Sequence, residues 1–248
     1  MSDDELIVKI KNYLDKKAIK FLVDNNIMNS FLREFILDDL FKSIKIDSNK
    51  RNEAFKNFLI NKNLKSKDDF ENYKIKNGWN NNNIESIILK PLKIKSLAEK
   101  LFEDQAESRF LARRKDLDLI VYSIIRSKNK QLAFELFLRI ESNEYSFAEL
   151  AYEHSEGTEK ITNGIIGPLY TSQVNPVLMN RLRTLKKKEL LEPFNFEDWW
   201  VILKLENEIP SEFTNTIKQQ MCIELLDDLL SKKIESNILT INDYLLRD

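Results

Sequence analysis

At 248 residues, the chain is long enough for one large domain or two domains of modest size. Its hydrophobic fraction of 42% is sufficient for a buried core, and its charged fraction of 32% favours a soluble folded protein. The 39 lysines and arginines nearly balance the 40 aspartates and glutamates, so the net charge is -1. With no overall basic field, we expect no nucleic-acid partner.

The sequence lacks the features of secreted, membrane-spanning, disulfide-bonded and metal-binding proteins. The first residues, Met1 to Glu5, are polar and acidic and do not resemble a secretory signal. No apolar run approaches the roughly 18 residues of a membrane span, so we expect no membrane insertion. The single cysteine, Cys222, has no partner for an internal disulfide, and no Cys/His set suggests a metal. These features predict a cytoplasmic protein without a metal or other cofactor.

Glycine and proline are concentrated in one part of the chain. Three of the four glycines and four of the five prolines lie in a single window, at positions 157, 164 and 167 and at 168, 176, 193 and 210. Glycine allows a positive φ and proline restricts the backbone, so both favour turns. We expect this window to be turn-rich and partly β, with helical segments on both sides.

The chain before this window has a helical pattern. Apolar residues recur at steps of three and four over residues 7–14, 31–41 and 54–59. Ser66 and Asp69 form a capping-box pattern, and the helix that they begin should end at Asn77-Gly78. A further helix is expected over residues 84–101, which Pro91 should kink or restart.

The periodicity changes after residue 116. Residues 117–125 are rich in β-branched side chains and are predicted to form a strand. Helices are expected over 132–140 and from Phe147, followed by the turn-rich segment, a short helix and a strand over 199–205. Helical spacing then returns over 211–233, whereas residues 238–246 are apolar and remain unassigned.

Short motifs within residues 117–208 resemble a known family. The run Phe147 to Gly157 (FAELAYEHSEG) resembles a helix and turn of parvulin-type peptidyl-prolyl isomerases. Asn163 to Leu169 (NGIIGPL), Gln173 to Leu178 (QVNPVL), the stretch LLEP at 190–193 and the closing stretch 199–206 follow in the family's order. Each patch alone is weakly specific, but five in order are much more so.

The resemblance implies a fold and a division of the chain. It implies an α+β, predominantly helical protein in which a small parvulin-like β-α-α-β-α-β domain, residues 117–208, is embedded in a helical chaperone-like body. The flanks resemble those of the PpiC and SurA kind of chaperone-isomerases. We therefore expect an N-terminal helical domain at 1–116 and a C-terminal helix within 209–248 that packs on it.

The resemblance also implies a binding site. Parvulins hold the proline ring in a pocket of three apolar residues, whose positions correspond here to Ile166, Val174 and Leu178. Gln173 lies in the same motif and is assigned with them to substrate binding. Such a pocket needs neither a metal nor a covalent intermediate, because excluding water and favouring the twisted amide lower the rotation barrier.

The polar half of the family's site is changed. Parvulins place two histidines and a cysteine or aspartate beside the rotating bond. The first histidine position corresponds to Ser123 and the acidic or thiol position to Gly157. The second histidine position falls on Trp200 or on Val201, depending on a one-residue choice of register. The only histidine, His154, matches none of these positions and is more typical of a surface residue.

Three functions are compatible with these sequence features. The first is a peptidyl-prolyl isomerase and chaperone with weak or no isomerase activity, which binds unfolded or proline-containing polypeptide. The second is a non-catalytic peptide-binding adaptor, and the third is a helical scaffold. The sequence does not identify the oligomeric state.

Overall fold

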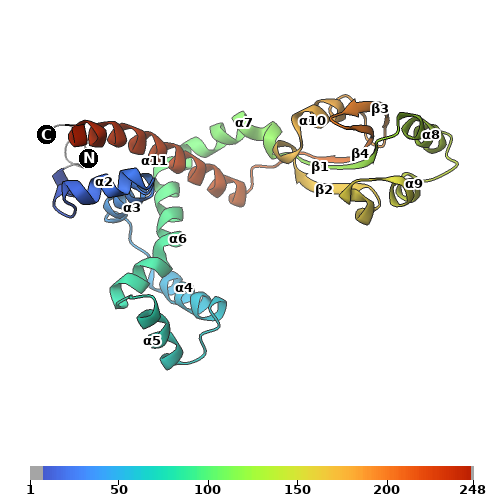
Figure 1. Cartoon of the computed structure of the whole chain (residues 1–248). Helices are drawn as coiled ribbons and strands as arrows, with labels where there is room; N and C mark the ends of the chain where they lie inside the picture. The colour runs from blue at the N-terminus through green and yellow to red at the C-terminus, as the bar shows by residue number, and fades with distance from the viewer. Residues whose placement is uncertain (1–7, 247–248) are drawn as a thin grey trace. The chain divides into compact units, whose positions relative to one another are not determined.

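The computed structural model describes residues 8–246 and divides into two compact units (Figure 1). One unit combines the chain up to Arg109 with the chain from Thr214 onward, and the other consists of Phe110–Phe213. The first is therefore discontinuous in sequence, and the second is an insert within it. The chain changes units at 109/110 and 213/214, a few residues outside the boundaries expected from the sequence.

The discontinuous unit is helical. Its helices are α2 (Lys16–Asp24), α3 (Met28–Phe41), α4 (Ser48–Asn61), α5 (Lys67–Lys76), α6 (Asn81–Phe102), the short 3-10 helix η1 (Glu103–Gln105) and α11 (Asn215–Leu246). Helix α7 (Ala106–Leu117) leads out of this unit. Helix α11 extends well beyond the expected end at residue 233 and includes the unassigned residues 238–246. It packs against α6 and α3, and its buried residues include Met221, Leu226 and Leu230.

The long helix α6 organises this unit. Near its start, Ile84, Ile88 and Leu89 pack against aromatic residues of α4 and α5. Figure 1 shows α4 and α5 beside the beginning of α6 and α11 beside its end. The helix continues through Pro91 without restarting. The predicted capping box of Ser66 and Asp69 is confirmed, as is the left-handed Gly78 after α5, whose φ is +68°.

The inserted unit is built on a four-stranded antiparallel sheet. The strands are β1 (Leu119–Ser127), β2 (Ile165–Tyr170), β3 (Leu190–Phe196) and β4 (Trp199–Ile209), in the order β2-β1-β4-β3. The helices between them are α8 (Lys130–Glu141), α9 (Phe147–His154), η2 (Thr158–Thr162), η3 (Thr171–Gln173) and α10 (Pro176–Leu182). The predominantly helical α+β class is confirmed. Strand β3, which forms a hairpin with β4, was not expected.

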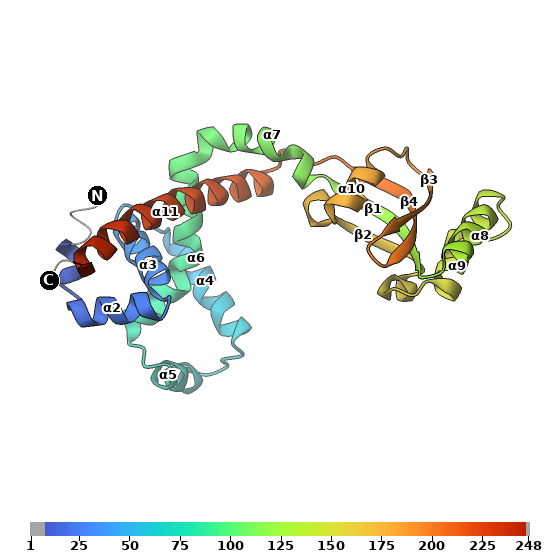
Figure 2. The ribbon, with the colours of Figure 1, turned by 45° about the horizontal axis from the view of Figure 1, so that its top comes forward.

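The two faces of the sheet carry different helices. Successive residues of a strand point to opposite faces. Tyr122 and Ile124 of β1 face α10, in a cluster with buried residues of α10 and with Val201, Leu203 and Leu205 of β4. Ile125 and Ile202 face the other way and pack against α8 and α9. Figure 2 shows α8 and α9 side by side, with α10 apart from them.

Two classes of feature are not found among residues 8–246. None of the helices described there is long and apolar enough to cross a membrane. The same residues contain no group of three or more His, Cys, Asp or Glu side chains placed to hold a metal ion.

Candidate functional site

Three of the residues predicted to bind substrate lie together on the α10 face of the sheet. Val174 and Leu178 are members of the buried cluster on that face, and Ile166 of β2 packs against it. Val174 and Leu178 are only 5% and 6% exposed, whereas Ile166 is half-buried. Asn175 caps the start of α10 and Pro176 is its first residue, so this motif aims Leu178 into the cluster. Ile166 is therefore the accessible member of the three.

Gln173, the fourth residue predicted to bind substrate, lies outside the buried cluster. Its side chain is exposed, and its Oε1 accepts a 3.2 Å hydrogen bond from the backbone N–H of Tyr170. It closes the short η3 turn that follows β2. In this structure Gln173 shapes the backbone that leads to Val174 and is not part of the apolar cluster.

Ser123 lies on the sheet face opposite to Val174 and Leu178. It is 1% exposed, and its hydroxyl donates a 2.8 Å hydrogen bond to Glu206 Oε1. Lys204 and Lys188 also contact the Glu206 carboxylate. Burial raises the pKa of Glu206, but hydrogen bonds from Lys188, Ser123 and Lys204 lower it by more, so the pKa lies below its ordinary value. Ser123 therefore belongs to a structural ion network.

The two candidates for the second histidine position lie on opposite faces. Trp200 pairs with Ser127 and packs near Phe134 of α8, with ring centroids 6.0 Å apart. Val201 is fully buried in the same cluster as Val174. Of the two, Val201 is the position on the α10 face of the sheet, in the buried cluster.

Gly157 adjoins a carboxylate that the motif comparison did not identify. A Cβ built at Gly157 would lie 2.1 Å from Glu159 Oε2 and 2.4 Å from Glu159 Oε1. The Glu159 carboxylate therefore occupies the space that any side chain at position 157 would need. Although Gly157 itself carries no polar group, the loop still supplies an acid two residues later.

Glu159 is buried in a network with β1. Its side chain is 1% exposed, and Oε2 lies 3.2 Å from Nη2 of Arg126. Oε1 accepts a 2.6 Å hydrogen bond from the Ser155 hydroxyl, and Ser155 Oγ in turn accepts the backbone N–H of Arg126 at 3.1 Å. The backbone N–H of Glu156 donates to the Arg126 carbonyl at 2.9 Å. Both the backbone and the side chain of Arg126 are thus held by the loop after α9.

This network borders the apolar cluster. Arg126 pairs with Val201 across β1 and β4, and Val201 pairs with Phe194 on β3, so the three residues form one row on the α10 face. Burial is the main cause that raises the pKa of Tyr122; the charge of Glu159 also raises it, and the charge of Arg126 lowers it. Motif comparison alone missed Arg126 and Glu159. The signal available in the sequence was an arginine within a strand otherwise rich in apolar residues.

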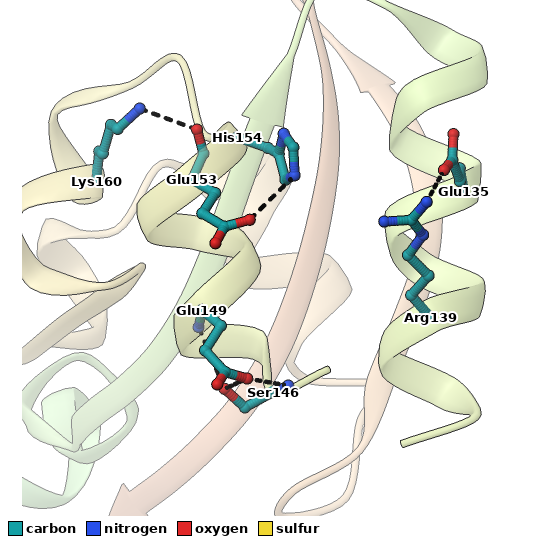
Figure 3. A network of polar contacts seen from close by, with 7 residues as sticks. All are labelled: Glu135, Arg139, Ser146, Glu149, Glu153, His154 and Lys160. Carbon is teal, nitrogen blue, oxygen red and sulfur yellow. Dashed lines mark hydrogen bonds and ion pairs between the residues drawn. The ribbon is translucent and has the colours of Figure 1, made fainter. Parts of the chain in front are cut away.

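His154 lies at the last position of α9. Its Nε2 is 3.5 Å from Glu153 Oε2, and Lys160 donates to the Glu153 carbonyl at 3.0 Å (Figure 3). At the other end of α9, the Ser146 hydroxyl and the Glu149 carboxylate form a capping box, drawn in the same figure. His154 is partly exposed and takes no part in the Arg126–Glu159 network as described.

Comparison with protein families identifies the inserted unit. The PPIC-type PPIase (rotamase) domain matches residues 125–207, which include most of β4, the whole of α10 and the loop that carries Glu159. Among curated proteins, the chaperone SurA of Colwellia psychrerythraea is 33% identical over 110 residues. That alignment covers 44% of this chain and 25% of the relative, so the chain spans only about a quarter of the curated protein that it matches.

Solved structures give weaker similarities. The peptidylprolyl isomerase PrsA of Bacillus anthracis aligns at 18% identity with a TM-score of 0.43, over 86% of this chain and 97% of that one. The foldase protein PrsA of Streptococcus pneumoniae aligns at 14% identity with a TM-score of 0.46, over 98% and 90%. Both scores are too low to establish a shared overall arrangement. The match to residues 125–207, with the sheet and helices found there, identifies this part of the chain as a PPIC-type domain of the parvulin family.

Proposed function

We propose that the chain binds unfolded or proline-containing polypeptide and that its parvulin-type domain catalyses slow isomerisation of X-Pro bonds. The observation that carries this proposal is an apolar cluster bordered by a charged pair on one face of a PPIC-type domain. Proline rings bind to apolar surfaces, and the X-Pro bond isomerises unaided over tens to hundreds of seconds. A site that favours the twisted amide would accelerate that step.

The half-buried rim of the cluster would receive the proline ring. Ile166, Phe194 and Trp199 pack against the buried core from different strands while retaining partial exposure. Val174 and Leu178 support this rim from beneath. An aliphatic ring placed there would lose water on one face, which weakens the solvation that favours the planar, polar amide.

The expected rate is low because the resemblance places the two histidine positions at Ser123 and at Trp200 or Val201, and none of these residues carries an imidazole. Removing one well-placed hydrogen-bonding group from an active site costs about 10² to 10³ in rate. We therefore propose that client binding is the main task and that isomerisation is secondary. The chaperone named among the relatives supports polypeptide as the class of partner.

A non-catalytic adaptor is the second candidate. It is favoured by the burial of Val174 and Leu178, which are only 5% and 6% exposed. If the rim does not open, the same surface would bind an apolar side chain without enclosing a proline ring. This candidate shares the binding surface with the first and differs only in turnover.

One experiment with two measurements separates these functions. A panel of X-Pro peptides is used to measure both affinity, by fluorescence anisotropy, and isomerisation, by a protease-coupled assay. The proposal expects binding together with a rate above the uncatalysed one and below that of a parvulin with both histidines. Binding with no acceleration would favour the adaptor, whereas no binding of any peptide would overturn both candidates.

A further inference from the structure

We infer that Arg126 is the catalytic hydrogen-bond donor of this domain and that Glu159 is the residue that positions it. The inference rests on the proposed isomerase function and assigns the polar half of that site. Neither residue coincides with a position where the motif comparison placed a polar group.

The burial of Glu159 requires a reason. Its side chain is 1% exposed, and among the described residues Oε2 accepts no hydrogen bond of good geometry, although Arg126 Nη2 is 3.2 Å away. Burying a carboxylate is costly unless a partner compensates it, and replacement of such pairs by apolar residues is often stabilising. An incompletely satisfied buried charge beside a binding surface is therefore a candidate for function.

Gly157 makes this arrangement possible. Its φ of -93° and ψ of 174° are accessible to any residue, so backbone conformation does not require glycine here. The available space does require glycine if the Glu159 carboxylate is to stay in place, because a Cβ at position 157 would lie 2.1 Å from Glu159 Oε2. The absence of a side chain at position 157 thus allows the Glu159 carboxylate to reach Arg126.

Arg126 is held but not enclosed. Its backbone is bound by Ser155 and Glu156 and its guanidinium by Glu159, yet 31% of its side chain is exposed. A guanidinium has five N–H donors in a rigid fork, so an ion pair through Nη2 leaves donors that can reach a ligand. Because Arg126 shares a row with Val201 and Phe194, those donors lie at the border of the apolar cluster.

Amide chemistry gives this donor a specific role. In the planar X-Pro bond, the nitrogen lone pair is delocalised into the carbonyl and is a poor acceptor. Twisting the bond returns the lone pair to nitrogen, which then accepts a hydrogen bond. An Arg126 N–H that donates to the prolyl nitrogen is therefore an interaction made only in the transition state, which raises kcat without tightening ground-state binding. No covalent bond forms and no proton is transferred, since the guanidinium stays protonated.

The test compares kcat, KM and peptide affinity among variants of the full chain. Arg126→Gln combined with Glu159→Gln removes the pair without leaving a buried charge. We expect this variant to lose about 10- to 100-fold in kcat, with peptide affinity within about twofold of the unmodified protein. Glu159→Gln alone should lose less, about tenfold, because the donor remains but is poorly held. Arg183→Met, at an exposed arginine after α10, is the matched control and should change nothing.

Moving the carboxylate from position 159 to position 157 tests whether Glu159 positions Arg126 or only stabilises the fold. Gly157→Ala should reproduce the loss of Glu159→Gln, because the new Cβ displaces the carboxylate while every charge is kept. Glu159→Ala should lose activity, and adding Gly157→Asp to it should restore most of the lost kcat by supplying a carboxylate in the vacated space. Urea unfolding verifies that each variant is folded. If a variant is not folded, Arg126→Lys is measured in its place.

The outcomes separate this inference from the function that it rests on. An active unmodified protein whose kcat survives in folded Arg126→Gln/Glu159→Gln overturns the inference alone. A change in KM without a change in kcat also overturns it, because Arg126 would then serve binding only. If the unmodified protein binds peptides but accelerates nothing, the isomerase function fails and the inference fails with it.

Discussion

The Ser123 hydroxyl on β1 donates a 2.8 Å hydrogen bond to Glu206 on β4, on the face of the sheet opposite to Val174 and Leu178. Ser123 thus stabilises the domain rather than contacting a substrate on the α10 face. The carboxylate that it contacts also binds Lys188 and Lys204. This relationship makes the stability of the domain dependent on pH.

The first prediction concerns that dependence. Although burial raises the pKa of Glu206, its hydrogen bonds lower it below the ordinary 4.5, so the carboxylate stabilises the folded state above that pH. This stabilisation is lost as the pH falls through the lower folded pKa. Glu206→Gln should cost about 1 kcal/mol of stability at about pH 7 and much less at about pH 3.

Urea unfolding followed by tryptophan fluorescence measures this cost. In a Trp79→Phe background, the fluorescence reports Trp199 and Trp200 of the domain. The exposed Glu192→Gln serves as the control; an equal loss at both pH values would contradict the ionic origin.

The second prediction tests whether Val174 stabilises the apolar cluster or contacts the substrate directly. Val174 is 5% exposed, so Val174→Asp would bury an unpaired charge and should unfold the domain rather than only block a pocket. Val177→Asp, three residues later and 52% exposed, is the matched control and should stay folded. Circular dichroism and amide NMR spectra distinguish the two outcomes. A well-folded Val174→Asp domain would show that this part of the cluster opens to solvent.

The third prediction addresses the accessible member of that cluster. Ile166→Ala should weaken peptide affinity by about 1 to 2 kcal/mol, the cost of removing apolar contact from a half-buried side chain. The domain should remain folded, since Ile166 lies on the rim. Fluorescence anisotropy with a proline-containing peptide measures the change, and Ile161→Ala at an 87% exposed position provides the comparison. Unchanged affinity would place peptide binding elsewhere in the chain.

The fourth prediction concerns the helical unit. Leu226 of α11 is fully buried where that helix packs on α3 and α6, so Leu226→Ala should cost about 2 to 5 kcal/mol of stability. Leu239, on the same helix, is 67% exposed, and its change to alanine should alter stability by less than about 0.5 kcal/mol. Urea unfolding followed by circular dichroism compares them. Equal effects would mean that α11 does not pack as described.

Local sequence features determined most of the secondary structure of this protein. Periodic apolar residues predict the main helices and strands β1 and β4, and Ser66 with Asp69 predicts the start of α5, because these signals act within a few residues. Five ordered motifs indicate the parvulin-type domain. Strand β3 was missed because Pro193 and the short apolar runs around it do not form a strand pattern by themselves. Its extended conformation depends on pairing with β4.

The arrangement of the site was decided by tertiary structure. Motif comparison places Ser123 at a polar site position, but the alternation of the strand directs its side chain to the opposite face from the apolar cluster. Arg126 and Glu159 are 33 residues apart in sequence and meet only because the loop after α9 packs along the edge of β1. Side-chain contacts between distant segments depend on register and packing, which no local pattern encodes. The sequence therefore determined which elements form and which family the domain resembles, whereas the fold decided which polar groups share the face of the apolar cluster.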